Sequence, residues 1–266
     1  MADSAEQQKL TRDQVHEAVR ASYGAVARSR NLEGKEEVSC CGPTCCAPDL
    51  RPLSDYTPAE LASVPPGAYL GEGSGVPARH ASLQPGESVV DLGAGAGMDS
   101  FLAANAVGPA GRVYAFDLTP DMLERARRNA AAGNYRQVSF ERADIEKLPL
   151  PSGTADAAIS NCVINLTPDK PAVYREIYRV LRPRGRLAVA DIVLRGDAQA
   201  LAAFRAASTT ETWCACVSGA LDETAYLDAI RAAGFADVHI VAERPALSQP
   251  GGKLEAVAVT VTARKL

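Results

Sequence analysis

The residues best suited to chemistry in this chain are its cysteines, because thiolates bind soft metals and metalloids and can act as nucleophiles. The seven cysteines are Cys40, Cys41, Cys45, Cys46, Cys162, Cys214 and Cys216. Four of them fall within seven positions, one stands alone, and two form a Cys-x-Cys pair. An odd number in an intracellular protein argues against a disulfide framework. The sequence therefore leaves metal or metalloid ligation, redox chemistry or simple burial as their roles.

Length, charge and hydropathy limit the class of protein. The 266 residues suffice for one domain with an appendage and for a large core. With 28 basic and 32 acidic residues the formal net charge is −4, which gives no electrostatic reason to expect nucleic acid or an anionic membrane as partner. No apolar run approaches the roughly 18 residues of a membrane span, and the polar segment 1–10 lacks a signal-peptide core. We expect a cytoplasmic protein with reduced thiols, and nothing requires more than a monomer.

The fold that must position these cysteines alternates strands with helices from residue 88 onward. Apolar runs predict strands at 88–92, 112–116, 137–140, 155–160, 185–192, 238–241 and 255–263. Helices are expected to begin at Thr119-Pro120 and Thr167-Pro168, and Asp222 caps a later one. This alternation predicts an α/β fold with a doubly wound, mostly parallel, seven-stranded Rossmann-like sheet.

The first third of the chain has a different character. Residues 10–28 predict a helix, opened by a capping box between Thr11 and Gln14. Residues 29–87 have little periodicity and contain eight prolines and the four clustered cysteines. We expect three parts. They are an N-terminal helix with a cysteine-rich segment at 1–60, a ligand-binding core at 61–195 and a C-terminal part at 196–266.

A glycine-rich turn follows the strand at 88–92 and reads Asp-Leu-Gly-Ala-Gly-Ala-Gly over residues 91–97. Ligands of doubly wound sheets bind beyond the carboxyl ends of the strands. Glycines there permit a tight turn and close approach of the backbone to a ligand at a helix N-terminus. The dinucleotide fingerprint needs a glycine where Met98 stands, and here the third glycine comes one place early at Gly97. Asp117 ends the next strand, 20 residues after Gly97, where a carboxylate can accept ribose hydroxyls.

The turn at 91–97 resembles motif I of S-adenosylmethionine-dependent methyltransferases. The string Ser-Asn-Cys-Val-Ile-Asn-Leu at 160–166, followed by Thr-Pro-Asp-Lys, resembles a hallmark of bacterial-type arsenite methyltransferases. Cys216, in Cys-Val-Ser-Gly-Ala, is similar to the second arsenic-binding thiolate of that family, and Cys40-Cys41 resembles its N-terminal cysteine region. The match runs from about residue 12 to the end of the chain.

The resemblance implies an enzyme that methylates trivalent arsenic, arsenite and also methylarsenite, bound to cysteine thiolates. Cys162 and Cys216 would bind As(III), with Cys40 and Cys41 as further catalytic thiols. The expected cofactor contacts follow the strands and are Asp91, Gly93, Gly95, Gly97, Asp117, Leu118, Met122, Asp144, Ile145 and Asn161. The implied methyl donor is S-adenosylmethionine, and the implied reductant is a thiol, glutathione or thioredoxin. Thioredoxin would be a protein partner, and As(III) could arrive as a thiol conjugate.

The chemistry agrees with this resemblance. Trivalent arsenic is soft and thiophilic, and its lone pair can attack a sulfonium methyl group without losing a proton. No general base is then needed at the transfer step. Of the three histidines, we expect His16 and His239 to be surface or packing residues and leave His80 undecided.

One departure from the family pattern concerns a Gly-Cys-Gly turn, which here reads Gly73-Ser74-Gly75. Serine is a hard, weak ligand for arsenic. Either Cys162 and Cys216 bind arsenic alone, or an N-terminal cysteine or Cys214 substitutes. For the four clustered cysteines, structural zinc, arsenic capture, redox regeneration of the active thiols and an inert segment all stay open.

Two other functions also stay open. The first is a methyltransferase for a small organic acceptor such as a quinone, because motif I is shared across such families. The second is an inactive thiol-based metalloid-binding protein, which the serine at position 74 would suit.

Overall fold

The computed structural model describes residues 11–29, 54–206, 219–248 and 254–266. Cys162 lies within these ranges. The other cysteines with predicted roles, Cys40, Cys41 and Cys216, lie outside them, as do Cys45, Cys46 and Cys214. No helix among the described residues is long and apolar enough to cross a membrane.

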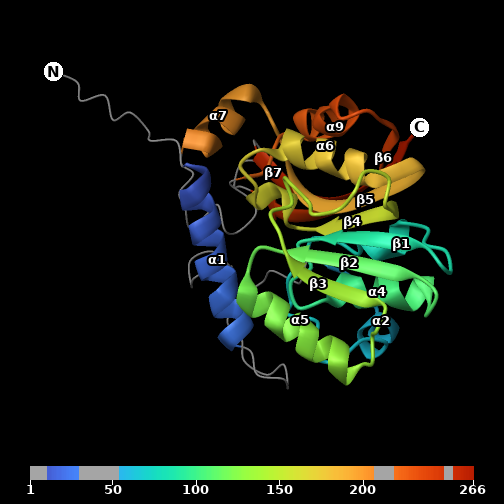
Figure 1. Ribbon diagram of the computed structural model, residues 1–266. Helices are drawn as coiled ribbons and strands as arrows, with labels where there is room; N and C mark the ends of the chain where they lie inside the picture. Colours follow the sequence, from blue (N-terminus) through green and yellow to red (C-terminus); the bar gives the residue numbers. More distant parts are fainter. Residues whose placement is uncertain (1–10, 30–53, 207–218, 249–253) are drawn as a thin grey trace.

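A single seven-stranded sheet forms the centre of the molecule (Figure 1). Its strands are β1 (Ser88–Leu92), β2 (Arg112–Asp117), β3 (Val138–Arg142), β4 (Ala155–Asn161), β5 (Leu181–Gly196), β6 (Phe235–Ser248) and β7 (Leu254–Lys265). The order across the sheet is β3-β2-β1-β4-β5-β7-β6. The first five are parallel, and β7 pairs antiparallel with both β5 and β6. The doubly wound, mostly parallel fold predicted from the sequence is confirmed.

Helices cover both faces of this sheet. They are α1 (Arg12–Ser29), α2 (Pro58–Ala62), α3 (Pro77–His80), α4 (Met98–Val107), α5 (Pro120–Ala132), α6 (Lys170–Val180), α7 (Ala198–Ala206) and α9 (Glu223–Ala232). Successive side chains of β1 point to opposite faces of the sheet. Val89 lies in a cluster with α4 on one face, whereas Val90 and Leu92 pack with α6 and α9 on the other. All three side chains are fully buried, as expected for a central parallel strand.

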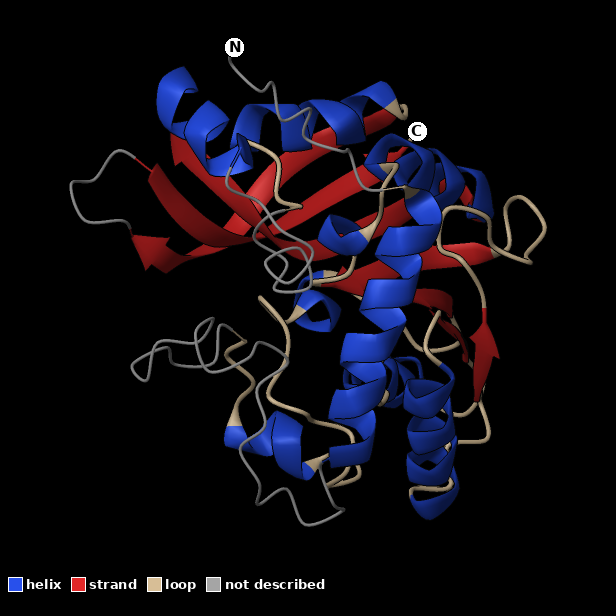
Figure 2. Ribbon diagram, turned by 90° about the vertical axis from the view of Figure 1, so that its left-hand side faces the viewer, coloured by secondary structure: helices blue, strands red, loops and turns tan. Residues whose placement is uncertain are grey.

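The N-terminal helix α1 runs along the side of the molecule on which β1, β2 and β4 end, beside α5 (Figure 2). Its predicted capping box is confirmed, because Thr11 N donates to Gln14 Oε1 at 2.8 Å and Gln14 N donates to Thr11 Oγ1 at 3.3 Å. At its other end Arg28 pairs with Asp121 of α5 at 2.7 Å. The helix is therefore tied to the core, and the division at residues 60 and 195 stays a prediction.

The predicted start of α6 at Thr167-Pro168 is wrong. Residues 164–166 form a short 3-10 helix, η1 (Ile164–Leu166), and the Thr167 hydroxyl donates to Ile164 O at 2.8 Å. Asp169 is the N-cap, and its carboxylate accepts a backbone N–H of the first turn of α6. Two favourable N-cap residues lie close together here, and the 3-10 turn uses the first of them.

The last three strands are longer than the sequence predicts. β5 continues to Gly196 and β6 runs over 14 residues, because residues 186–196 of β5 and both ends of β6 pair with the 12-residue β7. The parts of these strands that the apolar pattern missed carry polar or charged side chains such as Arg195 and Glu243, which pair with each other at 2.7 Å. Antiparallel strands at a sheet edge can expose such residues on one face.

Candidate functional site

An open pocket lies at the carboxyl ends of β1, β2 and β4, which is where a doubly wound sheet binds its ligand. Side chains of α1 close it from the outside. The predicted cofactor residues that line it are Asp91, Gly93, Gly95, Asp117, Leu118, Met122, Asp144, Ile145 and Asn161. The remaining one, Gly97, does not line the pocket and is instead the N-cap of α4. The structure thus brings together nine of the ten residues, while their roles in binding stay predictions.

The glycine-rich turn forms the floor of this pocket. Gly93 and Gly95 both adopt the left-handed region, with φ of +74° and +51°. A Cβ at Gly93 would meet the Val163 side chain at 2.5 Å, so this glycine allows the chain after β4 to lie directly on the turn. A Cβ at Gly95 would meet nothing within 4 Å and would project into open space. The turn is therefore shaped for a ligand that lies against its backbone.

Asp117 ends β2 beside this turn. Its Oδ2 accepts a hydrogen bond from Gly95 N at 2.9 Å and its Oδ1 accepts one from Thr119 N at 2.8 Å. Each carboxylate oxygen has two lone pairs, so both can still accept a ligand hydroxyl. Burial raises the pKa of Asp117, and the backbone N–H donors oppose that rise. The carboxylate is held in place before any ligand arrives.

Asp144 and side chains of α1 also line the pocket. His16 lines the pocket with its Nε2 4.0 Å from Asp144 Oδ2, and the expectation of a surface or packing histidine stays a prediction. No local pattern predicts this contact, because it depends on how α1 docks. His16, Asp144 and Glu146 are close enough to hold a metal ion. However, Arg12 already forms ion pairs with both carboxylates and supplies positive charge at that place.

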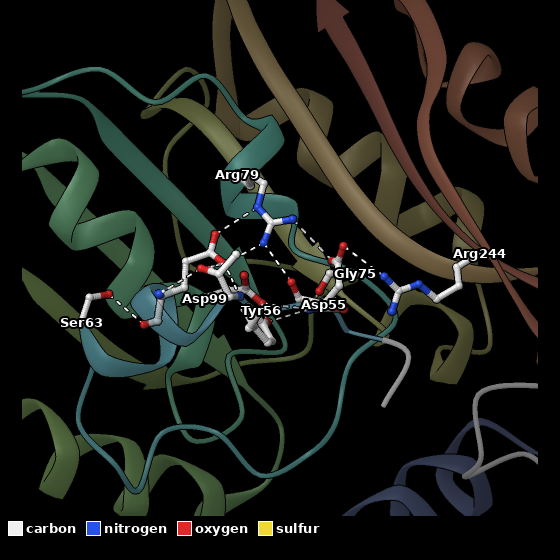
Figure 3. A network of polar contacts seen from close by, with 10 residues as sticks. Asp55, Tyr56, Ser63, Gly75, Arg79, Asp99 and Arg244 are labelled. Carbon is white, nitrogen blue, oxygen red and sulfur yellow. Dashed lines mark hydrogen bonds and ion pairs between the residues drawn. The ribbon is translucent and has the colours of Figure 1, made fainter. Parts of the chain in front are cut away.

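A buried polar network, which sequence analysis missed, surrounds the end of β4 (Figure 3). Asn161 Nδ2 donates to Asp99 Oδ2 at 2.9 Å and lies 3.0 Å from the Tyr56 hydroxyl oxygen. Tyr56 in turn donates to Asp99 Oδ2 at 2.7 Å. The segment before α2 continues outward through Asp55, which pairs with Arg244 at 3.1 Å. The position of Asp99 directly after the glycine turn could have drawn attention to it, whereas Tyr56 lies in a segment without periodic pattern.

The inner carboxylates of the pocket are electrostatically unusual. Burial, with a contribution from the neighbouring Asp99, raises the pKa of Asp91 to about 8. Burial raises the pKa of Asp99 to about 6, although hydrogen bonds from Tyr56 and Asn161 oppose the shift. A cation bound between these groups would compensate their mutual repulsion. The pocket is thus suited to a ligand that carries positive charge.

Cys162 follows β4 and lines the same pocket. Its φ is +59°, a left-handed conformation that costs a residue with a Cβ about 1 kcal/mol or more. Its backbone N–H donates to Ala190 O of β5 at 2.8 Å, which fixes the turn against the sheet. The structure therefore places one predicted thiol at the pocket. It describes none of the other three, Cys40, Cys41 and Cys216.

The turn at Gly73-Ser74-Gly75 lies beside the end of β4. Ser74 N donates to Asn161 Oδ1 at 2.9 Å, and Asn161 Nδ2 donates to Gly75 O at 2.8 Å. The Ser74 hydroxyl is buried and has no hydrogen-bond partner among the described residues. Position 74 is therefore held next to the residue that precedes Cys162.

The arrangement combines a glycine-lined pocket at the ends of the parallel strands with a cysteine in its wall. A methyltransferase domain model matches residues 83–234, more than half of the chain. The chain belongs to this methyltransferase family. The cofactor that the family supports is S-adenosylmethionine, and the pocket fits it. The open space at Gly95, the prepared carboxylate of Asp117 and the buried acidic groups suit a ribose and a positively charged sulfonium.

Comparison with known proteins points to one branch of methyltransferases. The chain is 40% identical over 194 residues to an arsenite methyltransferase of Halobacterium salinarum, covering 68% of this chain and 48% of the relative. It is 32% identical over 238 residues to an arsenite methyltransferase of Aquipseudomonas alcaligenes, covering 87% of this chain and 65% of the relative. The chain thus spans about half to two thirds of the length of these relatives.

A solved structure agrees with these sequence matches. It is an arsenic(III) S-adenosylmethionine methyltransferase from Chlamydomonas reinhardtii. Its TM-score is 0.61 at 26% identity, covering 94% of this chain and 74% of the other.

Proposed function

We propose that this methyltransferase methylates trivalent arsenic, arsenite and also methylarsenite, held by cysteine thiolates at the end of β4. The observation that carries the proposal is the presence of Cys162 in the wall of the pocket that suits S-adenosylmethionine. Arsenite methyltransferases among the similar proteins support the same choice of acceptor. When bound, S-adenosylmethionine supplies an electrophilic methyl group.

The residues of the chain bind and orient the two reactants. In this proposal Asp117, Leu118 and Met122 hold the ribose side of the cofactor, and Asp144 and Ile145 hold its adenine. Asp91, Gly93, Gly95 and Asn161 hold its amino-acid end. Gly97 contributes from behind, as the cap of α4 beneath the turn. Their shared task is alignment, which can lower a barrier by several kcal/mol.

The thiolates keep arsenic in place with its lone pair exposed. Cys162 and Cys216 are the proposed ligands, and Cys40 or Cys41 is proposed to join them. No base must remove a proton from arsenic, so it is no obstacle that, among the described residues, the pocket wall contains a single histidine, His16 beside Asp144. The proposal includes a thiol reductant, glutathione or thioredoxin, and a monomer acting in the cytoplasm, where such reductants keep cysteines reduced.

The decisive experiment is a product assay on the reduced protein with arsenite, S-adenosylmethionine and glutathione, in which arsenic species are separated and detected by mass. We expect methylarsenicals from the wild type and a loss of at least about hundredfold in rate for Cys162→Ser, because the soft ligand is gone. Cys216→Ser should behave similarly.

The control is S-adenosylhomocysteine binding, which both variants should retain because neither thiol supports the nucleotide. Full activity of Cys162→Ser would contradict the proposal. Arsenite binding without any product would favour the metalloid-binding alternative, and neither binding nor product would favour a small organic acceptor.

A further inference from the structure

The turn that carries Cys162 is held in a conformation that its own sequence does not favour. Cys162 is left-handed, and the three residues of η1 follow almost at once. Strained backbone of this kind persists only when the surrounding structure determines it strongly. The contacts that hold the turn therefore show which residues fix the position of the Cys162 side chain.

One side of the turn packs on the glycine-rich loop through Val163. The Val163 side chain occupies the space that a Cβ of Gly93 would fill, with its nearest atom 2.5 Å from that position. The segment that follows is held to β5 by a hydrogen bond. Asn165 Nδ2 donates to Ile192 O of β5 at 2.7 Å, and Asn165 is completely buried.

A buried lysine ties the turn to the start of α6. Lys170 Nζ donates to Asn165 O at 3.2 Å and to Thr167 O at 3.1 Å, and the residue is only 6% exposed. Lysine is almost never buried to this extent unless its charge is compensated. These two bonds fix both ends of the segment that directly follows the Cys162 turn.

Asp191 of β5 is a second buried ionisable group, and its charge interacts with that of Lys170. It is completely buried and accepts a hydrogen bond from the Tyr226 hydroxyl at 3.2 Å. Burial raises its pKa to about 7, while the Tyr226 hydrogen bond and the charge of Lys170 oppose that rise. The Tyr174 ring packs edge-on against Tyr226 with 6.0 Å between centroids.

This cluster is costly and does not touch the pocket. None of Lys170, Tyr174, Asp191 and Tyr226 is among the residues that line it. Buried groups of opposite charge often contribute no more stability than apolar residues of similar volume, so stability alone is weak ground for keeping them. The place of the cluster, directly beneath the turn that presents the thiol, suggests a different use.

We propose that the buried cluster of Lys170, Asp191, Tyr226 and Tyr174 is the positioning device of Cys162, holding residues 162–167 so that the thiol faces the pocket before substrate arrives. The inference rests on the proposed function for the identity of the substrate. The cluster acts through the turn, so its members are positioning residues and contact neither arsenic nor cofactor.

The chain offers a matched pair of lysines for the test. Lys265 Nζ donates to Tyr178 O at 2.6 Å and to Leu181 O at 2.7 Å, so it ties down the other end of α6 in the same way. Lys170→Met and Lys265→Met each remove two bonds to carbonyl oxygens. Amide hydrogen exchange of the peptide 160–169 is measured in both variants, together with S-adenosylhomocysteine affinity and the kinetics with arsenite.

For Lys170→Met we expect exchange in residues 160–169 to become about tenfold faster, because the turn opens locally. We expect kcat with arsenite to fall about ten- to hundredfold, with unchanged S-adenosylhomocysteine affinity. Lys265→Met should leave both readouts at the wild-type level, and Lys170→Arg should restore them in part because it can still donate to both carbonyls. If Lys170→Met does not fold, Asp191→Asn gives the same comparison with the lysine retained.

Equal exchange in residues 160–169 of the wild type and of whichever of Lys170→Met and Asp191→Asn folds would overturn the proposal. So would equal effects of the Lys170 and Lys265 changes on kcat. The exchange experiment contains no arsenic. If the wild type does not methylate arsenite, the proposed function fails, while faster exchange in the Lys170 variant alone still supports a role in holding the Cys162 turn.

Discussion

At the cofactor end of the pocket the important groups come from neighbouring strand ends, whereas at the acceptor end they come from segments far apart in the chain. Asp91, Gly95 and Asp117 lie within 27 positions of one another and are joined by the pairing of β1 with β2. Cys162 shares its proposed task with residues near 40 and 216. One end is thus built by local geometry of the sheet, and the other depends on long-range folding.

This difference predicts that the two ends respond differently to substitution. A parallel sheet fixes where its strands end, so backbone N–H groups of the glycine turn donate to Phe116 O and to the Asp117 carboxylate. The Cys162 turn is strained and needs the buried cluster beneath it. We therefore expect changes at one end to leave the other largely intact, and each prediction below tests that separation.

At the cofactor end the largest effect is expected for Asp117→Ala. Loss of hydrogen bonds from the ribose to a charged carboxylate should weaken S-adenosylhomocysteine binding about ten- to hundredfold in a titration calorimetry experiment. Asp121→Ala is the matched control, because this aspartate of α5 pairs with Arg28 at 2.7 Å and does not line the pocket. Arsenite binding should be unchanged in both variants, and a parallel loss of arsenite binding would break the separation of the two ends.

A smaller effect is expected for Ser74→Cys at the acceptor end. The Ser74 hydroxyl is buried and has no hydrogen-bond partner within the part of the chain that the structure describes, so its replacement by a thiol loses no hydrogen bond seen there. A third soft ligand near Cys162 should raise arsenite affinity about tenfold and increase the share of more highly methylated products. Ser63→Cys on the exposed end of α2 adds a thiol elsewhere and should change neither. An unchanged affinity would mean that position 74 cannot reach the arsenic.

The same contrast separates what the sequence could predict from what it could not. The strand Ser88–Leu92, the glycine turn and the position of Cys162 follow from local patterns and agree with the structure. The start of α6 was missed because Thr167 and Asp169 are both favourable N-caps, and burial of the lysine after Asp169 fixes the second. Tyr56 and His16 were missed because their contacts depend on docking of segments across the pocket, which leaves no periodic signal.

The smallest effect is the pH dependence of S-adenosylmethionine affinity, which we expect to arise at the cofactor end of the pocket. The pKa of Asp99 is raised to about 6 and that of Asp91 to about 8, chiefly by burial. A positively charged cofactor favours the ionised carboxylates, so its binding should lower both pKa values and release protons. Affinity for S-adenosylmethionine should therefore rise with pH, roughly fivefold between pH 6 and 8, as measured by calorimetry in buffers of different ionisation enthalpy.

Two comparisons make this prediction specific to the buried carboxylates. S-adenosylhomocysteine lacks the sulfonium charge, so its affinity should change less with pH. Asp99→Asn keeps the shape of the side chain and removes one titrating group, which should flatten the slope for S-adenosylmethionine below pH 7. Tyr56 faces Asp99 with a pKa well above the ordinary value for tyrosine, mainly through burial, so it stays protonated throughout this range. The same slope in Asp99→Asn would assign the pH dependence to another group and remove the electrostatic argument for a cation between Asp91 and Asp99.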